Sequence, residues 1–139
     1  MSGASPGGRW GARLAPYASL PLRIAVGWVF LRHGSMKLHM GVGGVAGFLG
    51  HLGFPVPAVW AVILIGVETI GAGCVVLGLF TRFWAACLAV DMIVAISLAV
   101  LPSHHAPELE GLLLAGALAL ALLGDGPVSV GALLRLRKK

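Results

Sequence analysis

Apolar residues occur in four long runs along the chain, separated by short segments rich in glycine, proline or charged residues. The runs cover roughly residues 20–38, 57–80, 82–101 and 109–124. Each is close to the roughly 17 to 25 residues that a helix needs to cross a bilayer, although the last run is the shortest. A Gly-Asp-Gly-Pro segment at 124–127 gives that run a clear stop. The pattern predicts an all-α integral membrane protein, a bundle of four helices.

Composition supports the same class of protein. Of the 139 residues, 58% are hydrophobic and only 11% are charged, with a mean hydropathy of +0.96, whereas soluble domains average about 25% charged residues. The 21 glycines are typical of membrane helices, where small residues let backbones approach closely. We expect one membrane domain over 20–131, a disordered N-terminal tail over 1–19 without the apolar core of a signal peptide, and a basic C-terminal tail over 132–139.

The basic residues predict the orientation of the helices. If the four runs alternate in direction, eight cations fall on one side of the membrane: Arg9, Arg13, Arg23, Arg82, Arg135, Arg137, Lys138 and Lys139. Positive charge is retained on the cytoplasmic side, so both termini are expected there. The basic C-terminal stretch either lies along anionic headgroups or forms a solvated tail. Because the cations are confined to the membrane margins, the pI of about 10.0 indicates topology and not nucleic-acid binding.

Ionisable residues also lie inside the apolar runs. Glu68 stands at the middle of the second run and Asp91 at the middle of the third, while the first run has its midpoint near Phe30. At about 1.5 Å rise per residue, Arg32 and His33 lie roughly 3 to 5 Å from that midpoint. These residues from three helices therefore share one depth in the bilayer.

The first run carries a polar stripe that can face this shared depth. At about 100° per residue, Arg23, Phe30, His33 and Lys37 fall within one arc, whereas Arg32 points to the other side. An unpaired charge at this depth costs about 2.5 to 3.5 kcal/mol, so the groups are expected to face inward and satisfy one another. Such a cluster either holds the bundle together through buried pairs or marks a functional site; ionisable residues inside membranes favour function.

Two other groups of residues have the right chemistry for a site but weak patterns. Cys74 and Cys87 lie at matching depth in adjacent helices, yet a reducing cytoplasmic side favours inert thiols over a redox pair. His104, His105 and Glu108 are metal-ligand residue types in one short loop, but they lack a spacing with a defined geometry. We expect no metal.

Two longer motifs resemble a known family. The run RIAVGWVFLRHGSMKL resembles the first-helix signature of the DoxX family of small bacterial membrane proteins, and GVETIGAGCVVLGLFTR resembles its second-helix signature and following turn. Further similar features are a Gly-Phe-Pro segment at 53–55, an acid at Glu110 near the start of the last helix, and a GxGPxS-like ending at 124–129. The order and spacing of these motifs cover about residues 20 to 131.

The resemblance implies a four-helix membrane bundle with links to quinone-dependent and sulfur-dependent redox systems. The resulting hypothesis is a membrane subunit of a redox assembly that binds a quinone-like amphiphile between the first three helices. In it, Glu68, His33 and Asp91 relay protons. The residues assigned to ligand binding are Arg23, Phe30, Arg32, Lys37 and Glu110. Of these, Arg23 and Lys37 are also expected to hold the bundle ends or to pair with Glu110 and other acids.

The chain contains no haem-ligand pair, flavin motif or iron-sulfur spacing. It is therefore at most a subunit of an oxidoreductase, and a soluble redox partner is expected to dock. Two alternatives remain open. One is a small proton-coupled transporter that acts as a homo-oligomer through glycine faces at Gly66, Gly71 and Gly73. The other is a membrane anchor or assembly factor without catalytic activity.

Overall fold

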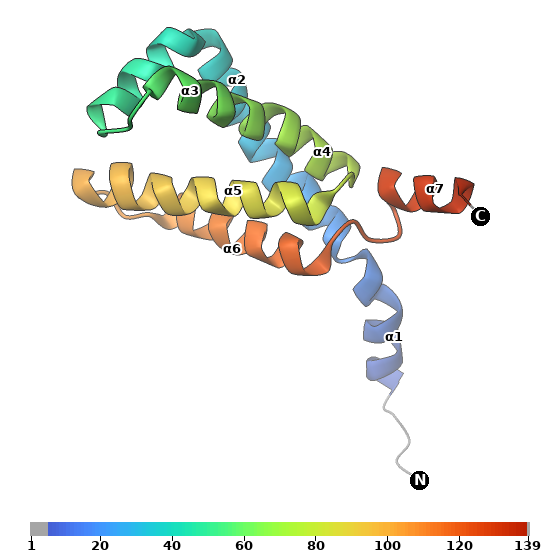
Figure 1. Ribbon diagram of the computed structural model, residues 1–139. Helices are drawn as coiled ribbons and strands as arrows, with labels where there is room; N and C mark the ends of the chain where they lie inside the picture. Colours follow the sequence, from blue (N-terminus) through green and yellow to red (C-terminus); the bar gives the residue numbers. More distant parts are fainter. Residues whose placement is uncertain (1–5, 139) are drawn as a thin grey trace.

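The computed structural model describes residues 6–138, and these form helices joined by short turns and loops (Figure 1). In chain order, the elements are α1 (Pro6–Leu14), η1 (Ala15–Tyr17), α2 (Ser19–His51), α3 (Pro57–Gly66), η2 (Val67–Gly71), α4 (Ala72–Leu77), α5 (Thr81–Ala95), η3 (Ile96–Val100), η4 (Leu101–Ser103), α6 (Glu108–Leu123) and α7 (Val130–Arg137). The elements η1 and η4 are 3-10 turns, whereas η2 and η3 are π-helical turns that continue α3 and α5. The all-α prediction is confirmed.

Helices lie in both segments that were expected to be tails. Helix α1 lies within the segment that we expected to be disordered, and α7 occupies most of the basic C-terminal segment. Residues 1–5, Lys139 and the side chain of Arg9 lie outside the described part of the structure. Figure 1 shows α1 and α7 at the same end of the molecule, which is called the terminal end below.

Within residues 6–138, three helical stretches are long and apolar enough to cross a membrane: Trp10–His51, Pro57–Leu77 and Thr81–Ser103. Helix α6 has 16 residues, or about 24 Å at the α-helical rise, which is less than the roughly 30 Å of a hydrocarbon core. It packs beside α5 in the opposite direction and forms the fourth helix of the bundle (Figure 1). The prediction of a multi-pass membrane protein is therefore confirmed, with a fourth helix shorter than the other three.

Helix α2 extends further than its apolar run predicted. We expected the first helix to end near residue 38, but α2 continues to His51 with a break at Gly41, whose φ of 76° and ψ of 162° are non-helical. Glycine adopts this backbone region readily because it has no Cβ. Beyond the break, Val45 and Leu49 pack against Ala61 and Ile65 of α3. The second half of α2 thus forms a hairpin with α3 at the end opposite the terminal end.

The main core lies between α2, α4, α5 and α6. Phe30 is fully buried there with Val75, Leu88 and Leu120. Many large apolar side chains are exposed on the outside of the helices, among them Trp28, Ile70 and Leu122. An apolar exterior is expected for helices that contact lipid. Lipid tails are themselves apolar, so these side chains gain little by leaving lipid for the protein interior.

Candidate functional site

Glu68 lies in the π-helical turn η2 and is only 1% exposed. A π turn places one extra residue in the helical ladder, and such turns are frequent at functional sites. Helix α2 approaches η2 closely at Gly34, where an added Cβ would lie 2.7 Å from the backbone oxygen of Glu68. The absence of a side chain at Gly34 therefore allows α2 to approach the acidic turn.

Three ionisable side chains from three different helical elements meet at this point. The Nζ of Lys37 donates a hydrogen bond to the Oε2 of Glu68 at 2.5 Å, and the Glu68 side chain is almost fully buried. Asp91 of α5 lies close to both groups and lines the same cavity. The Oδ2 of Asp91 is buried, and no hydrogen-bond partner for it exists among residues 6–138. We call Lys37, Glu68 and Asp91 the buried triad.

The buried triad borders a cavity with a volume of about 370 Å³, within the roughly 300 to 1,000 Å³ of small-molecule sites. The cavity lies between the α2–α3 hairpin and the α5–α6 pair, and most of its lining is apolar. Its aromatic side chains are Phe48, Phe54 and Trp60, and the rings of Phe54 and Trp60 contact edge to face. Its ionisable side chains, apart from the thiol of Cys87, are His33, Lys37, Glu68, Asp91 and Glu110.

The structure therefore brings together five of the eight residues that the sequence singled out. The remaining three lie elsewhere: Phe30 is in the main core, Arg32 is exposed on the surface of α2, and Arg23 is at the terminal end. Lys37 was expected to hold a bundle end or to pair with Glu110 and other acids. The structure pairs it with an acid, but that acid is Glu68 and not Glu110, because α2 crosses the second span near Glu68 and brings the ammonium to its carboxylate.

Several cavity residues were not assigned from the sequence. Phe54 and Trp60 flank the turn between α2 and α3, which lies beyond the break at Gly41, and both line the cavity. Cys87 lies one turn from Asp91 and also lines the cavity. Both Cys87 and Cys74 are free thiols in the structure. The sequence did contain one indication that Cys87 belongs to the site: it precedes Asp91 by four residues, a spacing that places both side chains on the same face of a helix.

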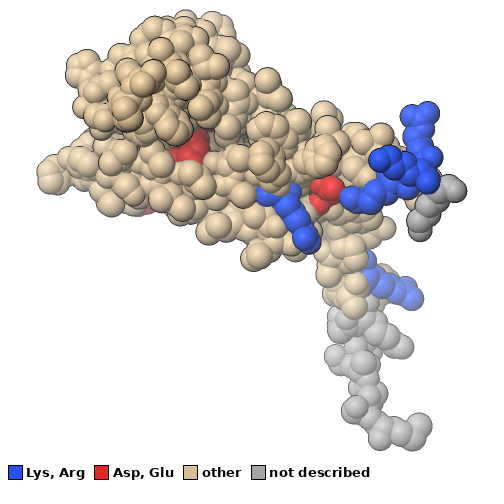
Figure 2. Space-filling view, viewed as in Figure 1, with Lys and Arg blue, Asp and Glu red and all other residues tan. Residues whose placement is uncertain are grey.

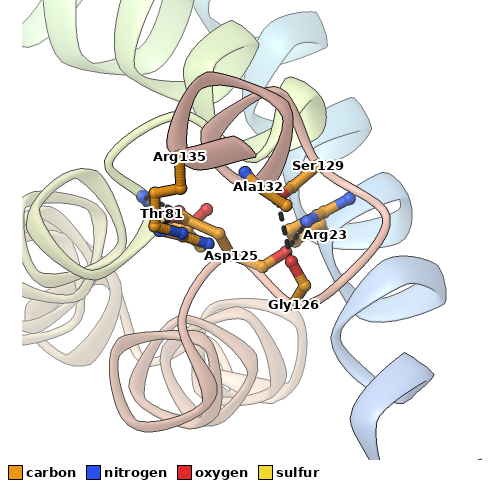
Figure 3. A network of polar contacts seen from close by, with 7 residues as sticks. All are labelled: Arg23, Thr81, Asp125, Gly126, Ser129, Ala132 and Arg135. Atoms are coloured by element: carbon orange, nitrogen blue, oxygen red, sulfur yellow. Dashed lines mark hydrogen bonds and ion pairs between the residues drawn. The ribbon is translucent and has the colours of Figure 1, made fainter. Parts of the chain in front are cut away.

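Arg23 is the centre of a separate polar network at the terminal end (Figure 3). Its guanidinium is buried and donates from Nη1 to the carbonyl of Asp125 and from Nη2 to the carbonyl of Val128, the latter at 2.6 Å. Arg23 was expected either to hold a bundle end or to pair with an acid. It holds a bundle end, and it does so through backbone carbonyls and not through an acidic side chain. This network is remote from the cavity.

The side chain of Asp125 extends that network to two more elements. Its Oδ1 accepts a hydrogen bond from the Thr81 amide at 2.9 Å, and its Oδ2 pairs with Arg135 at 3.2 Å. Burial raises the pKa of Asp125, but the hydrogen bond from the Thr81 amide and the contact with the charged Arg135 outweigh it and hold the pKa below the ordinary 3.8. Asp125 is thus ionised and joins the α4–α5 turn to α7.

Two further predicted features can be located. Across residues 6–138, no group of three His, Cys, Asp or Glu side chains is arranged to hold a metal ion. Gly71, expected on an oligomer face, instead packs against Trp84 of the same chain, because an added Cβ would lie 2.6 Å from its ring. Gly71 is therefore used inside the monomer, whereas nothing lies within 4 Å of a Cβ placed at Gly66 or Gly73.

Comparisons with known proteins agree with the motif analysis. The profile of the DoxX family matches residues 18–101, which is more than half of the chain and includes the whole buried triad. Neither the curated proteins nor the solved structures searched contain a match to the chain. The motifs near Glu110 and at 124–129 lie beyond the matched part. The resemblance seen in the sequence is confirmed, and this multi-pass membrane protein belongs to the DoxX family.

Proposed function

We propose that this protein is the membrane subunit of a redox assembly and that its cavity binds a quinone or a similar amphiphile beside the buried triad. The observation that carries the proposal is a set of ionisable groups, Lys37, Glu68 and Asp91, at the wall of an apolar cavity inside a membrane bundle. Ionisable residues within membrane spans are costly and usually serve a function. A ligand with a polar head and an apolar body suits both parts of the lining.

The triad offers complementary groups to a quinone head. The Lys37 ammonium has three N–H donors, of which one bonds Glu68, so it can also donate to a quinone carbonyl. The buried Oδ2 of Asp91 is an acceptor for a quinol hydroxyl. If Glu68 and Asp91 share one proton, the positive charge of Lys37 makes the triad neutral. A triad without net charge suits the low-dielectric surroundings, where an uncompensated charge would be costly.

Reduction of a quinone to a quinol consumes two electrons and two protons. We assign the electrons to a soluble redox protein that docks on the membrane subunit. The proton shared by Glu68 and Asp91 passes to one quinone oxygen. His33 and Glu110, which line the same cavity, then deliver two protons in turn to the carboxyl pair, one for the other quinone oxygen and one that restores the shared proton. The aromatic side chains Phe48, Phe54 and Trp60 cover the apolar part of the ligand.

The charge distribution supports an orientation for this subunit. Figure 2 shows basic side chains gathered at the terminal end, around α7 and the adjacent helix ends, in the view drawn. Cytoplasmic segments of membrane proteins carry an excess of Lys and Arg. We therefore place the terminal end in the cytoplasm of a bacterial cell and the α2–α3 hairpin toward the opposite side of the plasma membrane.

Binding of decylubiquinone to the purified, detergent-solubilised full chain tests the proposal. Trp60 lines the cavity, so a bound quinone should quench its fluorescence, and a Trp60→Phe variant isolates that signal. We expect saturable quenching, and at least about tenfold weaker binding in Glu68→Gln, because that variant removes the carboxylate that positions Lys37. Glu108→Gln is the matched control, since Glu108 is exposed and does not line the cavity.

Two results would overturn the quinone assignment. One is the absence of saturable quenching in the unmodified protein, and the other is equal binding by the Glu68 and Glu108 variants. Size-exclusion chromatography and helical circular dichroism show whether each variant is folded. Proton flux through liposomes that contain the protein alone would instead support the transporter alternative.

A further inference from the structure

A second hollow lies at the terminal end, far along the bundle from the triad. It is an open groove of about 650 Å³ between the α4–α5 turn, the 123–127 segment and the first turns of α7. Its lining combines two arginines, Arg82 and Arg135, with the apolar side chains Phe80, Phe83 and Leu123. Neither the buried triad nor the proposed redox chemistry uses this groove.

The polar part of the groove carries a net positive charge. Arg135 pairs with Asp125 through Nη1, and its guanidinium keeps further N–H donors, because arginine has five. Arg82 makes a longer hydrogen bond, 3.3 Å, to the carbonyl of Leu122 and is exposed. The carboxylate of Asp125 offsets one of the two cations, so one positive charge is available to an anion.

The apolar part of the groove is presented outward. Phe80 has a left-handed backbone, with φ of 51°, and is 71% exposed at the tip of the α4–α5 turn. Phe83, one turn further, is 61% exposed, and Leu123 at the end of α6 is 49% exposed. Cationic and apolar groups thus lie side by side at the ends of membrane helices, where lipid headgroups meet hydrocarbon.

We infer that this groove binds an acidic phospholipid, with the phosphate between Arg82 and Arg135 and the acyl chains along Phe83 and Leu123. Arginine matches phosphate oxygens with its planar fork of donors. Basic pockets at the ends of transmembrane helices bind acidic headgroups. The gathering of basic side chains at this end (Figure 2) also attracts anionic lipid, whereas zwitterionic lipid has no net charge to complement the groove.

Native mass spectrometry of the delipidated full chain tests this site, with phosphatidylglycerol and phosphatidylcholine added in turn. We expect retained phosphatidylglycerol adducts and few phosphatidylcholine adducts. The double variant Arg82→Gln/Arg135→Gln should bind phosphatidylglycerol at least about tenfold more weakly, since each cation near an anionic headgroup contributes a severalfold gain in affinity. Millimolar sodium phosphate should not displace the lipid, because phosphate lacks the acyl chains that contact Phe83 and Leu123.

A second double variant, Arg13→Gln/Arg137→Gln, is the matched control. It removes the same charge from exposed positions that do not line the groove, and it should bind lipid as the unmodified protein does. Arg82→Gln alone leaves the Asp125 network intact, so it tests the site even if the Arg135 variant unfolds. Equal losses in both double variants, equal binding of both lipids, or displacement by sodium phosphate would each overturn the proposal.

Discussion

Lys37 donates a hydrogen bond to Glu68 at 2.5 Å across the bundle, although the two residues are 31 positions apart in the chain. The contact joins the first membrane helix to the π turn of the second. Separately, each residue would carry an unpaired charge into a lipid-facing bundle, which is costly. Pairing explains how this apolar chain accommodates both groups, and it leaves Asp91 as the carboxyl group available to a ligand.

Removal of one member of this pair should destabilise the protein more than removal of both. We expect Lys37→Met to lower the free energy of unfolding by about 3 to 5 kcal/mol, because it leaves the buried Glu68 carboxylate unpaired. The double variant Lys37→Met/Glu68→Gln should recover most of that loss. Unfolding by sodium dodecyl sulfate in mixed micelles measures these differences, and strictly additive effects would contradict a direct interaction.

Asp91→Asn should affect ligand binding more than folding. The Asp91 Oδ2 has no hydrogen-bond partner in the described chain, so we expect the free energy of unfolding to change by less than about 1 kcal/mol. The Asp91 carboxylate accepts from a quinol hydroxyl, so its replacement should weaken the binding of decylubiquinol, measured by how well decylubiquinol displaces decylubiquinone, by about tenfold or more. Fluorescence quenching and unfolding of the same preparation measure both quantities. A large loss of stability with unchanged affinity would assign Asp91 to structure alone.

Gly34→Ala should separate α2 from the acidic turn. Its Cβ would lie 2.6 Å from the Cγ2 of Thr69 and 2.7 Å from the backbone oxygen of Glu68, and we expect a cost of about 1 to 3 kcal/mol from overpacking. Gly43→Ala, in the same helix, is the control because nothing lies within 4 Å of its Cβ. It should be neutral or stabilising by up to about 1 kcal/mol. Equal effects of the two substitutions on unfolding would contradict the close approach at Gly34.

The network around Asp125 should resist mild acid. Because the folded-state pKa of Asp125 lies below its ordinary 3.8, the stability that the carboxylate contributes is present above that value and declines only as the pH falls further. We expect Asp125→Ala to cost about 1 to 3 kcal/mol at neutral pH, since the Thr81 amide loses its acceptor. Asp125→Asn, which keeps an oxygen there, should cost less.

Unfolding measured from neutral to strongly acidic pH tests the sign of this dependence. The gap between the unmodified protein and Asp125→Ala should stay constant above pH 3.8 and narrow below it. A gap that already closes in mildly acidic buffer would mean that burial dominates and that the pKa of Asp125 is raised instead.

The positions of the spans and the depths of their acids followed from the sequence because both depend on local properties. Hydropathy along each run predicted the helices now seen as α2 to α6. Counting the rise per residue placed Glu68, Asp91 and His33 at one level, and all three line one cavity. The same counting did not identify Glu68 as the partner of Lys37, because depth along one helix does not show where a tilted neighbour crosses it.

By itself, then, the sequence determined that the chain is an all-α membrane protein of the DoxX family with ionisable residues inside its spans. Only the tertiary structure decided which of those residues meet. The break at Gly41 and the π turn at η2 rotate side chains in ways that a regular periodicity cannot describe. Arg23 and Asp125 are 102 positions apart. They are in contact because the segment between α6 and α7 folds over the end of the bundle. Which side chains contact one another depends on how distant helices cross and how loops fold over them. Hydropathy and rise per residue, in contrast, depend only on residues that are neighbours in the sequence.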